Sequence, residues 1–115
     1  MGKGKRVYVI ENQKGEVKIG VSNNVDVRIK AIQNQTGYKI TNTYFTDICF
    51  NPFEIEKEIQ NAFEKSKVFG EWFSISFKDA VKETKRVFGQ KALFKELKAS
   101  RNNIDLFEYF HSNLV

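Results

Sequence analysis

The sequence contains little of the histidine and thiol chemistry on which many enzymes depend. Among its 115 residues there is one cysteine, Cys49, and one histidine, His111. A single cysteine excludes an internal disulfide and a thiolate metal cluster, and it is typical of a reducing compartment. A single histidine excludes a histidine cage around a metal and disfavours a histidine-based triad. The chemistry of any site therefore falls to tyrosine, lysine, arginine and carboxylates.

Long apolar runs are also missing. The longest uninterrupted run, Val7 to Ile10, has four residues, whereas a helix that crosses a membrane needs about 20. No apolar signal-peptide stretch opens the chain. We therefore expect a cytoplasmic protein without a membrane partner.

Aromatic residues and positive charge, in contrast, are plentiful. Eleven phenylalanines, four tyrosines and one tryptophan stand within a composition that is 41% hydrophobic, enough for the core of a single domain. Nineteen lysines and arginines exceed 14 aspartates and glutamates, which gives a net charge of +5. A mildly basic balance of this kind suits a protein that meets phosphate, although charge alone does not decide it.

The spacing of apolar and turn residues predicts a mixed fold. We expect strands near residues 6–11, 16–20, 38–50 and 71–77, with helices after residues 24, 51 and 76. This order predicts an α/β fold of the α+β type, with a small, mainly antiparallel sheet of three to four strands flanked by helices. Residues 1–5 form a flexible basic start, residues 6–88 the domain, and residues 89–115 a helical tail that packs on the domain or forms an oligomer contact.

Three local signals mark the helices. Asn51, Pro52 and Glu54 predict a capped helix start with a capping box. Gly37 and Gly89 predict the ends of the helices before and after it. The tail beyond residue 89 carries two further apolar stripes, which break near residues 100–103.

One set of residues has the chemistry that phosphodiester hydrolysis requires. Tyr8 lies in the first expected strand, Lys18 and Gly20 in the second, Arg28 in the following helix and Glu56 in the next. Hydrolysis needs a positioned water, cations for the phosphate oxygens and help for the departing oxygen. Helical periodicity does not choose between Glu56 and Glu58 as the functional carboxylate. A hairpin register that the sequence leaves open decides whether Tyr8 and Lys18 share a face.

These residues, in this order, resemble the GIY-YIG endonuclease superfamily. Val7-Tyr8 stands for the end of the GIY element, and Lys18-Ile19-Gly20 stands for the YIG element. Asn24 and Arg28 follow at the family's offset, and Glu56 precedes Phe63 by seven residues. Together with Gly70-Glu71-Trp72-Phe73, the pattern is similar to the branch common in bacteriophage and mobile-element proteins. The resemblance covers about residues 6–81.

The resemblance implies a role for each residue. Tyr8 would be the base, and Arg28 and Lys18 would contact phosphate, with Arg6 and Lys30 as further nucleic-acid contacts. Glu56 would bind Mg²⁺ or Mn²⁺, because one carboxylate is enough for an ion that keeps several waters. A tyrosine of ordinary pKa about 10 first has to be made more acidic, and Lys18 and the metal are the expected sources of positive charge.

The sequence departs from the wider family at three positions. Arg6 replaces a glycine of the first element, Lys18 replaces the tyrosine of the second, and Gln60 stands where the branch often has histidine. The leading hypothesis is a divalent-metal-dependent endonuclease that cuts DNA, with a homodimer suited to cutting both strands.

Two other classes of function stay open. The first is an inactive GIY-YIG-like module that binds nucleic acid, a small anionic ligand or a protein partner, such as a phage-encoded regulator or inhibitor. The second is a structural or inhibitory oligomer joined through the phenylalanine-rich tail. Taken singly, each candidate also has an ordinary structural interpretation: Tyr8 as a core residue, Arg28 and Lys30 as a solvated helix face, and Glu56 as a partner of Gln60.

Overall fold

The sheet at the centre of the fold is antiparallel throughout. A computed structural model describes the backbone of residues 4–100 and the side chains of residues 4–91. Within them the sheet has the strand order β3-β1-β2-β5-β4. The strands are β1 (Arg6–Asn12), β2 (Val17–Ser22), β3 (Ile40–Phe45), β4 (Lys67–Phe69) and β5 (Trp72–Phe73). The α+β class is confirmed. The expected three to four strands become five, because the exposed three-residue β4 pairs with β5 around Gly70.

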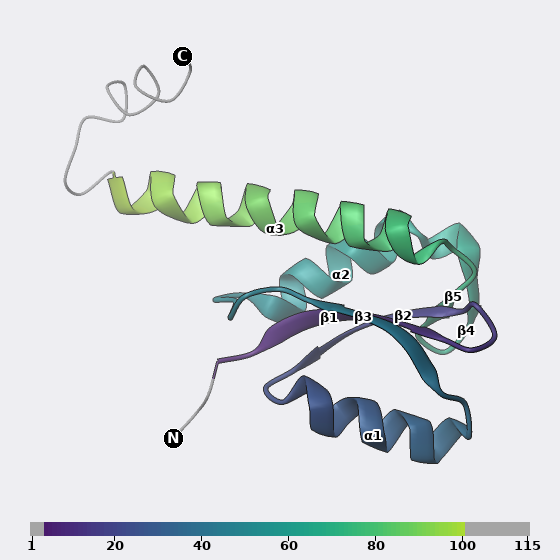
Figure 1. Ribbon diagram of the computed structural model, residues 1–115. Coiled ribbons are helices and arrows are strands. Elements are labelled where there is room, and N and C mark those ends of the chain that lie inside the picture. The colour runs from purple at the N-terminus through teal and green to yellow at the C-terminus, as the bar shows by residue number, and fades with distance from the viewer. Residues whose placement is uncertain (1–3, 101–115) are drawn as a thin grey trace.

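Helices cover both faces of the sheet. They are α1 (Val25–Thr36), α2 (Pro52–Ala62) and α3 (Phe77–Ser100), with a single 3₁₀ turn at Glu64–Ser66. Helix α1 lies on one face, and α2 and α3 lie on the other (Figure 1). Within the described residues no helix is long and apolar enough to cross a membrane.

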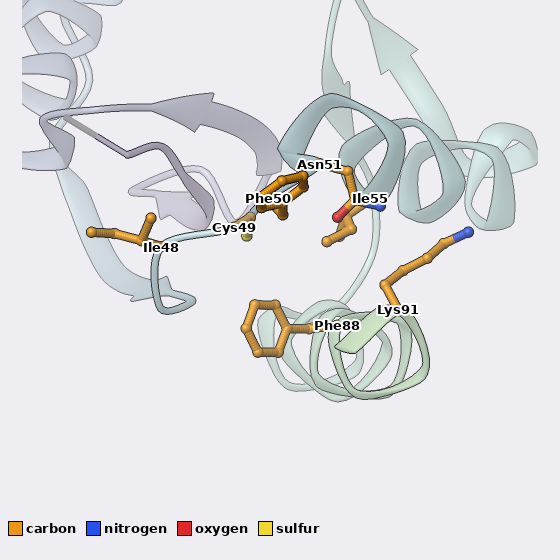
Figure 2. Close-up of a pocket in the computed structure, with 7 residues that line it drawn as sticks. All are labelled: Ile48, Cys49, Phe50, Asn51, Ile55, Phe88 and Lys91. Atoms are coloured by element: carbon orange, nitrogen blue, oxygen red, sulfur yellow. The ribbon is translucent and has the colours of Figure 1, made fainter. Parts of the chain in front are cut away.

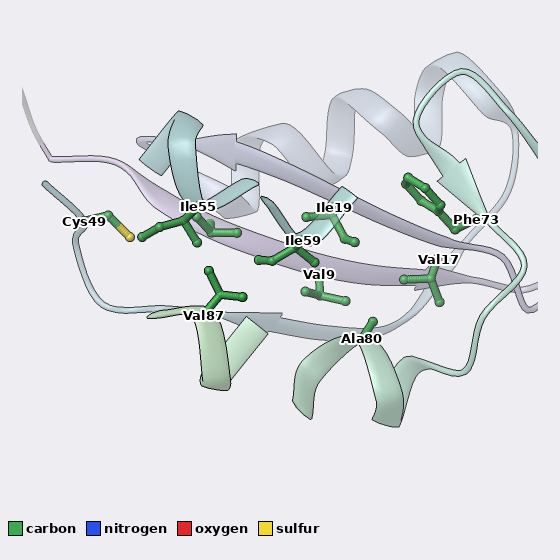
Figure 3. Close-up of a cluster of buried hydrophobic side chains, with 10 residues drawn as sticks. Val9, Val17, Ile19, Cys49, Ile55, Ile59, Phe73, Ala80 and Val87 are labelled. Carbon is green, nitrogen blue, oxygen red and sulfur yellow. The ribbon is translucent and has the colours of Figure 1, made fainter. Parts of the chain in front are cut away.

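Each face of the sheet has its own core. On the side of α2 and α3, Val9 and Ile19 pack with Ile55, Ile59 and Val87 (Figure 3). On the side of α1 the buried residues are Tyr8, Ile10, Val25, Ile32 and Trp72. The run Val7 to Ile10 is apolar without alternation because β1 is buried on both faces. Each fully buried aliphatic side chain here contributes about 1.5–3 kcal/mol relative to exposure.

The expected start and end of α1 are confirmed. The Asn24 side chain accepts a hydrogen bond from the Val27 backbone N–H at 3.2 Å, as an N-cap does. At the other end Gly37 has a φ of 77°, and its N–H donates to the Gln33 carbonyl. That left-handed conformation favours glycine, and it ends the helix.

The start of α2 lies where the sequence predicts it, but the capping box is wrong. Pro52 occupies the first turn and Asn51 the N-cap position. The Asn51 amide, however, donates to the Glu54 carboxylate at 2.6 Å, and its side chain makes no cap bond to the backbone. The two polar side chains satisfy each other in place of the helix N–H groups.

Two of the expected strands, 38–50 and 71–77, are longer than the strands that the structure shows. The first of these ends at Phe45, because the Thr46 hydroxyl accepts a hydrogen bond from the Val7 N–H at 3.1 Å and the chain then turns. The expected strand 71–77 ends at Phe73. The Ser76 hydroxyl accepts from the Asp79 N–H at 3.0 Å, which begins α3 at Phe77. A local cap therefore overrides the alternation of apolar residues.

The expected helix end at Gly89 is also wrong, since α3 continues to Ser100. Gly89 is not among the glycines with positive φ, and a glycine ends a helix only where the chain turns into the left-handed region. The later stripes of the tail, from Ile104 onward, and His111 lie outside the described residues. The division at residue 88 and the oligomer contact stay predictions.

Candidate active site at the open edge of β2

A hollow of about 370 Å³ opens at one edge of β2, and we call it the polar hollow. Its lining includes the four residues expected to be catalytic, which come from β1, β2, α1 and α2. The full lining is Tyr8, Lys18, Gly20, Val21, Arg28, Phe53, Glu56 and Glu71. The fold thus brings together a phenol, two cations and two carboxylates from segments far apart in the sequence.

The strand register places Tyr8 and Lys18 on the same face of the sheet. Tyr8 pairs with Gly20, and Ile10 pairs with Lys18. Directly paired residues of an antiparallel ladder project to the same side, and so do residues two apart along one strand. The hairpin register, which the sequence leaves open, therefore puts Tyr8 and Lys18 on a shared face.

Gly20 makes room for the Tyr8 ring. A Cβ added to Gly20 would lie 2.3 Å from the Tyr8 hydroxyl oxygen and 2.4 Å from Cζ. The ring therefore lies across β2 at Gly20 and carries the hydroxyl toward the strand's outer edge. Strand β5 pairs only with Val17 and Lys18 of β2. The half of β2 that contains Gly20 is thus free to face the hollow.

Helix α2 is attached to the same edge by a side chain. The Gln60 amide donates a hydrogen bond to the Ile19 carbonyl at 3.0 Å, which satisfies a backbone group beside Gly20. Glu56 lies one helical turn earlier and lines the hollow. Gln60 therefore has a structural role here in holding α2 beside β2.

Glu56 and Glu58 of α2 have different surroundings in the structure. The Glu58 carboxylate lies 3.3 Å from the Lys91 Nζ, and Glu54 lies 3.8 Å from the same amine. Both carboxylates face α3, while Glu56 faces the polar hollow. The choice between them depends on how α2 packs against α3, which periodicity alone does not give.

Two carboxylates lie close to Lys18 in the hollow. Burial raises the pKa of Glu56 above its usual range, the neighbouring Glu71 raises it further, and Lys18 lowers it in part. Glu71 forms an ion pair with Lys18, whose Nζ lies 6.0 Å from the centre of the Trp72 ring. The Lys18 side chain is 16% exposed and that of Glu71 is 56% exposed, so the pair lies at the surface of the hollow.

Tyr8 is less acidic than the sequence argument requires. Burial raises its pKa to about 12, Arg28 opposes this, and Glu71 and Glu56 add to the increase. The residue that lowers the pKa is Arg28, whereas Lys18 was expected, because Lys18 is paired with Glu71. Arg28 thus supplies the positive charge that was expected of Lys18, burial outweighs its effect on the pKa of Tyr8, and the contribution expected of the metal stays a prediction.

The family sequence model described as T5orf172 domain matches residues 5–89. The chain belongs to this family. The matched region runs from the start of β1 into α3 and contains every residue of the polar hollow. Membership indicates a phage-associated domain of nuclease-like or DNA-binding character. Searches of curated proteins and of solved structures found no match.

The two remaining cations expected to contact nucleic acid lie outside the polar hollow of this T5orf172 domain. Arg6 lies in a second hollow on the same side of the sheet, with its guanidinium 5.3 Å from the centre of the Phe45 ring. Lys30 is exposed on α1 and lines neither hollow. The structure thus brings Arg28 and Lys18 together, Arg6 close by, and Lys30 elsewhere.

The carboxylates of the polar hollow fit a hard divalent cation with few protein ligands. Glu56 and Glu71 offer oxygen donors, which Mg²⁺ and Mn²⁺ prefer. Among the described residues no group of three or more His, Cys, Asp or Glu side chains could hold a metal. A cation here would complete its coordination with water and substrate phosphate, as Mg²⁺ commonly does.

Sequence reasoning named Glu71 only as part of the Gly70-Glu71-Trp72-Phe73 motif, without a definite role, and it missed Phe53. Glu71 precedes Trp72, and Trp72 pairs with Lys18, a pairing that periodicity does not predict. Phe53 stands in the first turn of α2 and is 59% exposed. Its unusual exposure for a phenylalanine could be found only from the structure.

A third hollow, of about 130 Å³, lies between α2 and α3 and is lined mainly by apolar residues such as Ile48, Ile55 and Phe88 (Figure 2). Its cysteine, Cys49, is buried, and its thiol lies 3.2 Å from the Thr46 hydroxyl. Lys91 at its rim is paired with Glu58. This hollow therefore offers packing and little chemistry.

Proposed function

We propose that this T5orf172 domain is a divalent-metal-dependent endonuclease that hydrolyses DNA phosphodiester bonds by a GIY-YIG-type mechanism. The observation that carries the proposal is the convergence of Tyr8, Lys18, Arg28 and Glu56 on one polar hollow of about 370 Å³. Their spacing in the sequence resembles the superfamily, and their meeting in space supplies a physical reason for that spacing. The family match supports a nuclease-like or DNA-binding domain more generally.

Each side chain has a distinct task in this proposal. Arg28 is exposed on α1, and its planar guanidinium can bind two phosphate oxygens at once. Lys18 supplies a second cation after it exchanges Glu71 for phosphate. Glu56 would hold Mg²⁺ or Mn²⁺, which when bound neutralises charge that develops on the phosphate oxygens.

Tyr8 would accept the proton of the attacking water as a phenolate, after its own hydroxyl proton has been released to solvent. In the free protein its pKa of about 12 keeps the hydroxyl protonated near neutral pH. Two of the groups that raise this pKa are Glu56 and Glu71. A cation held by Glu56 would reduce the part of the increase that the carboxylates cause, and Arg28 would stabilise the phenolate, while burial, the largest cause, would still oppose ionisation.

The inactive binding module is the second candidate. Lys18 is engaged by Glu71, the Tyr8 pKa is raised, and Gln60 is used to hold α2, where the phage-like branch often has histidine. A site with these properties can hold an anion without turning it over. The two candidates share the polar hollow and differ in whether DNA is cut.

A plasmid cleavage assay with two matched glutamates tests the proposal. Supercoiled DNA is incubated with Mg²⁺ or Mn²⁺ and with wild type, Glu56→Gln or Glu58→Gln. We expect wild type and Glu58→Gln to nick the plasmid and Glu56→Gln to be inert, because Glu56 lines the hollow whereas Glu58 is paired with Lys91. The nuclease proposal fails if wild type and Glu56→Gln are equally inert on plasmid, single-stranded DNA and RNA. Binding without cutting would then favour the inactive module.

A further inference from the structure

The second hollow has a composition unlike that of the polar hollow. It has a volume of about 240 Å³ and is lined by Arg6, Asn23, Asn24, Val25, Asp26 and Phe45. This volume is below the ~300–1,000 Å³ of pockets that enclose drug-sized ligands, so it suits one small planar group. We call it the aromatic hollow, after Phe45.

The two hollows lie close together on the same face of the sheet. Arg6 precedes Tyr8 by two residues on β1, and Phe45 pairs directly with Tyr8 from β3. Both side chains therefore project to the side of Tyr8. Two strand residues span about 7 Å, a separation on the scale of one nucleotide. The first turn of α1 borders both hollows, since it contributes Asp26 to one and Arg28 to the other.

Arg6 lies over the ring of the partly exposed Phe45, and we call this pair the platform. The Arg6 guanidinium lies 5.3 Å from the centre of the Phe45 ring, and the Phe45 residue is 47% exposed. Arg6 Nη1 also donates to the Thr46 carbonyl at 2.9 Å, so the guanidinium is fixed in place. Exposed aromatic rings are the surfaces on which nucleic-acid bases stack in single-strand binding proteins, and an arginine over the ring adds a cation–π contribution.

Two polar side chains at this platform have unused hydrogen-bonding groups. In the part of the chain that the structure describes, the exposed side chains of Asn23 and Asp26 form no hydrogen bond or ion pair. The neighbouring Asn24 is different, because its side chain caps α1. Asn23 can donate and accept, whereas the Asp26 carboxylate only accepts. A carboxylate at such a place favours a base with an amino group, such as cytosine, over thymine.

We propose that the aromatic hollow binds one unpaired nucleobase of the substrate strand, stacked on Phe45 and Arg6 and read by Asn23 and Asp26. The inference rests on the proposed function, because it places this base next to the phosphate in the polar hollow. It also extends that function by naming the substrate class: a strand that is single, or locally unpaired, beside the scissile bond. Base selectivity then comes from the domain itself.

Binding without cleavage tests the stacking. Fluorescence anisotropy in EDTA measures the affinity of labelled oligonucleotides of about 12 residues, either single-stranded or duplex, for wild type, Phe45→Ala and Phe69→Ala. Phe69 is the matched control, because it is 59% exposed on β4 and lines neither hollow. We expect Phe45→Ala to weaken single-strand binding by roughly five- to one-hundred-fold. Duplex affinity and the Phe69→Ala variant should be unchanged.

Three outcomes would overturn the stacking proposal: an unchanged affinity of Phe45→Ala for single strands, an equal loss for single strands and duplex, or an equal loss in Phe69→Ala. Phe45→Ala keeps the net charge, so a loss of affinity with an unchanged salt dependence is not electrostatic. A thermal melt of each variant confirms that it is folded. Phe45→Tyr, which keeps the ring, should restore most of the affinity.

The base selectivity has its own variant. Wild type should bind oligo-dC more tightly than oligo-dT, and Asp26→Asn should abolish that difference; equal affinities in wild type would refute the role of Asp26. Because EDTA removes the divalent ion, these results are independent of hydrolysis. Base binding without plasmid cleavage would reject the nuclease proposal and support base binding in the aromatic hollow. Plasmid cleavage with no effect of Phe45→Ala on binding would support the nuclease proposal and reject base binding in the aromatic hollow.

Discussion

Replacing Gly20 by alanine is the sharpest test of how the polar hollow is built. The added Cβ would lie 2.3 Å from the Tyr8 hydroxyl oxygen, 2.4 Å from Cζ and 2.9 Å from Cε2. Ordinary contacts of a Cβ begin near 3.4 Å, so the overlap is about 1 Å with the hydroxyl oxygen and Cζ and about 0.5 Å with Cε2. The contact is not with the end of a flexible side chain. Tyr8 is 2% exposed, and its ring has little room in which to move.

The energetic cost follows from this overlap. Overpacking in a well-packed core typically costs about 1–3 kcal/mol. A rigid, buried ring on the central strand places Gly20→Ala toward the upper part of that range. Because each kcal/mol shifts the melting temperature of a domain of this size by about 4–8 °C, we expect a decrease of roughly 10–20 °C. Displacing the Tyr8 hydroxyl should also remove any plasmid cleavage.

A second glycine provides a control of opposite sign. A Cβ on Gly89 would meet nothing within 4 Å, and Gly89 lies inside α3. Gly89→Ala should therefore raise the free energy of unfolding by about 0.5–1 kcal/mol, through helix propensity. Thermal melts followed by circular dichroism measure both variants. The account of the Tyr8 ring is refuted if Gly20→Ala is as stable as wild type, or if the two variants shift in the same direction.

Three further predictions follow from single contacts. The pKa of Glu56 is raised in the fold, so its contribution to stability is present below its unfolded pKa and is lost as pH rises through the folded value. Thermal melts at acidic and neutral pH should therefore show that Glu56→Gln is more stable than wild type only at neutral pH. A difference in stability that does not depend on pH would contradict this prediction. Glu71→Gln frees Lys18 for phosphate, so DNA binding in EDTA should tighten and its salt slope should steepen by about one phosphate contact; an unchanged slope would count against it. Asn24→Ala removes the cap of α1 and should cost about 0.5–2 kcal/mol in a denaturant titration, an effect that Asn24→Ser should largely avoid.

The parts of the fold that the sequence predicted well are those with local signals. The cap at Asn24 and the left-handed Gly37 mark α1 from both sides. Pro52 marks the start of α2 in the same way. The errors occur where two local signals compete. At residues 74–77 the alternation of apolar residues favours a strand, but the Ser76 cap begins a helix.

The candidate site was predictable as a set of residues and unpredictable as a geometry. Ordered motifs selected Tyr8, Lys18, Arg28 and Glu56, and all four line the hollow. The role of Glu71 depends on pairing across the sheet between segments more than 50 residues apart in the chain. Periodicity along one element carries no information about such a contact. The same holds for the increase in the pKa of Tyr8 that Glu56 and Glu71 cause, because it arises only when the fold brings these carboxylates close to the buried Tyr8.

The polar hollow owes its existence to the shortness of β5. A strand that paired with all of β2 would cover Gly20 as well as Val17 and Lys18, and it would close the edge that the Tyr8 ring crosses. In the observed sheet that edge is instead completed by Gln60 of α2, which binds the Ile19 carbonyl and leaves the side of Gly20 to Glu56. A side chain can satisfy one backbone group where a strand would satisfy several, so the edge is stable and still open. Gln60→Ala should therefore loosen α2 from β2 and reduce activity through the position of Glu56, while Gln60→Glu, which accepts but does not donate a hydrogen bond when ionised, should be no better than alanine.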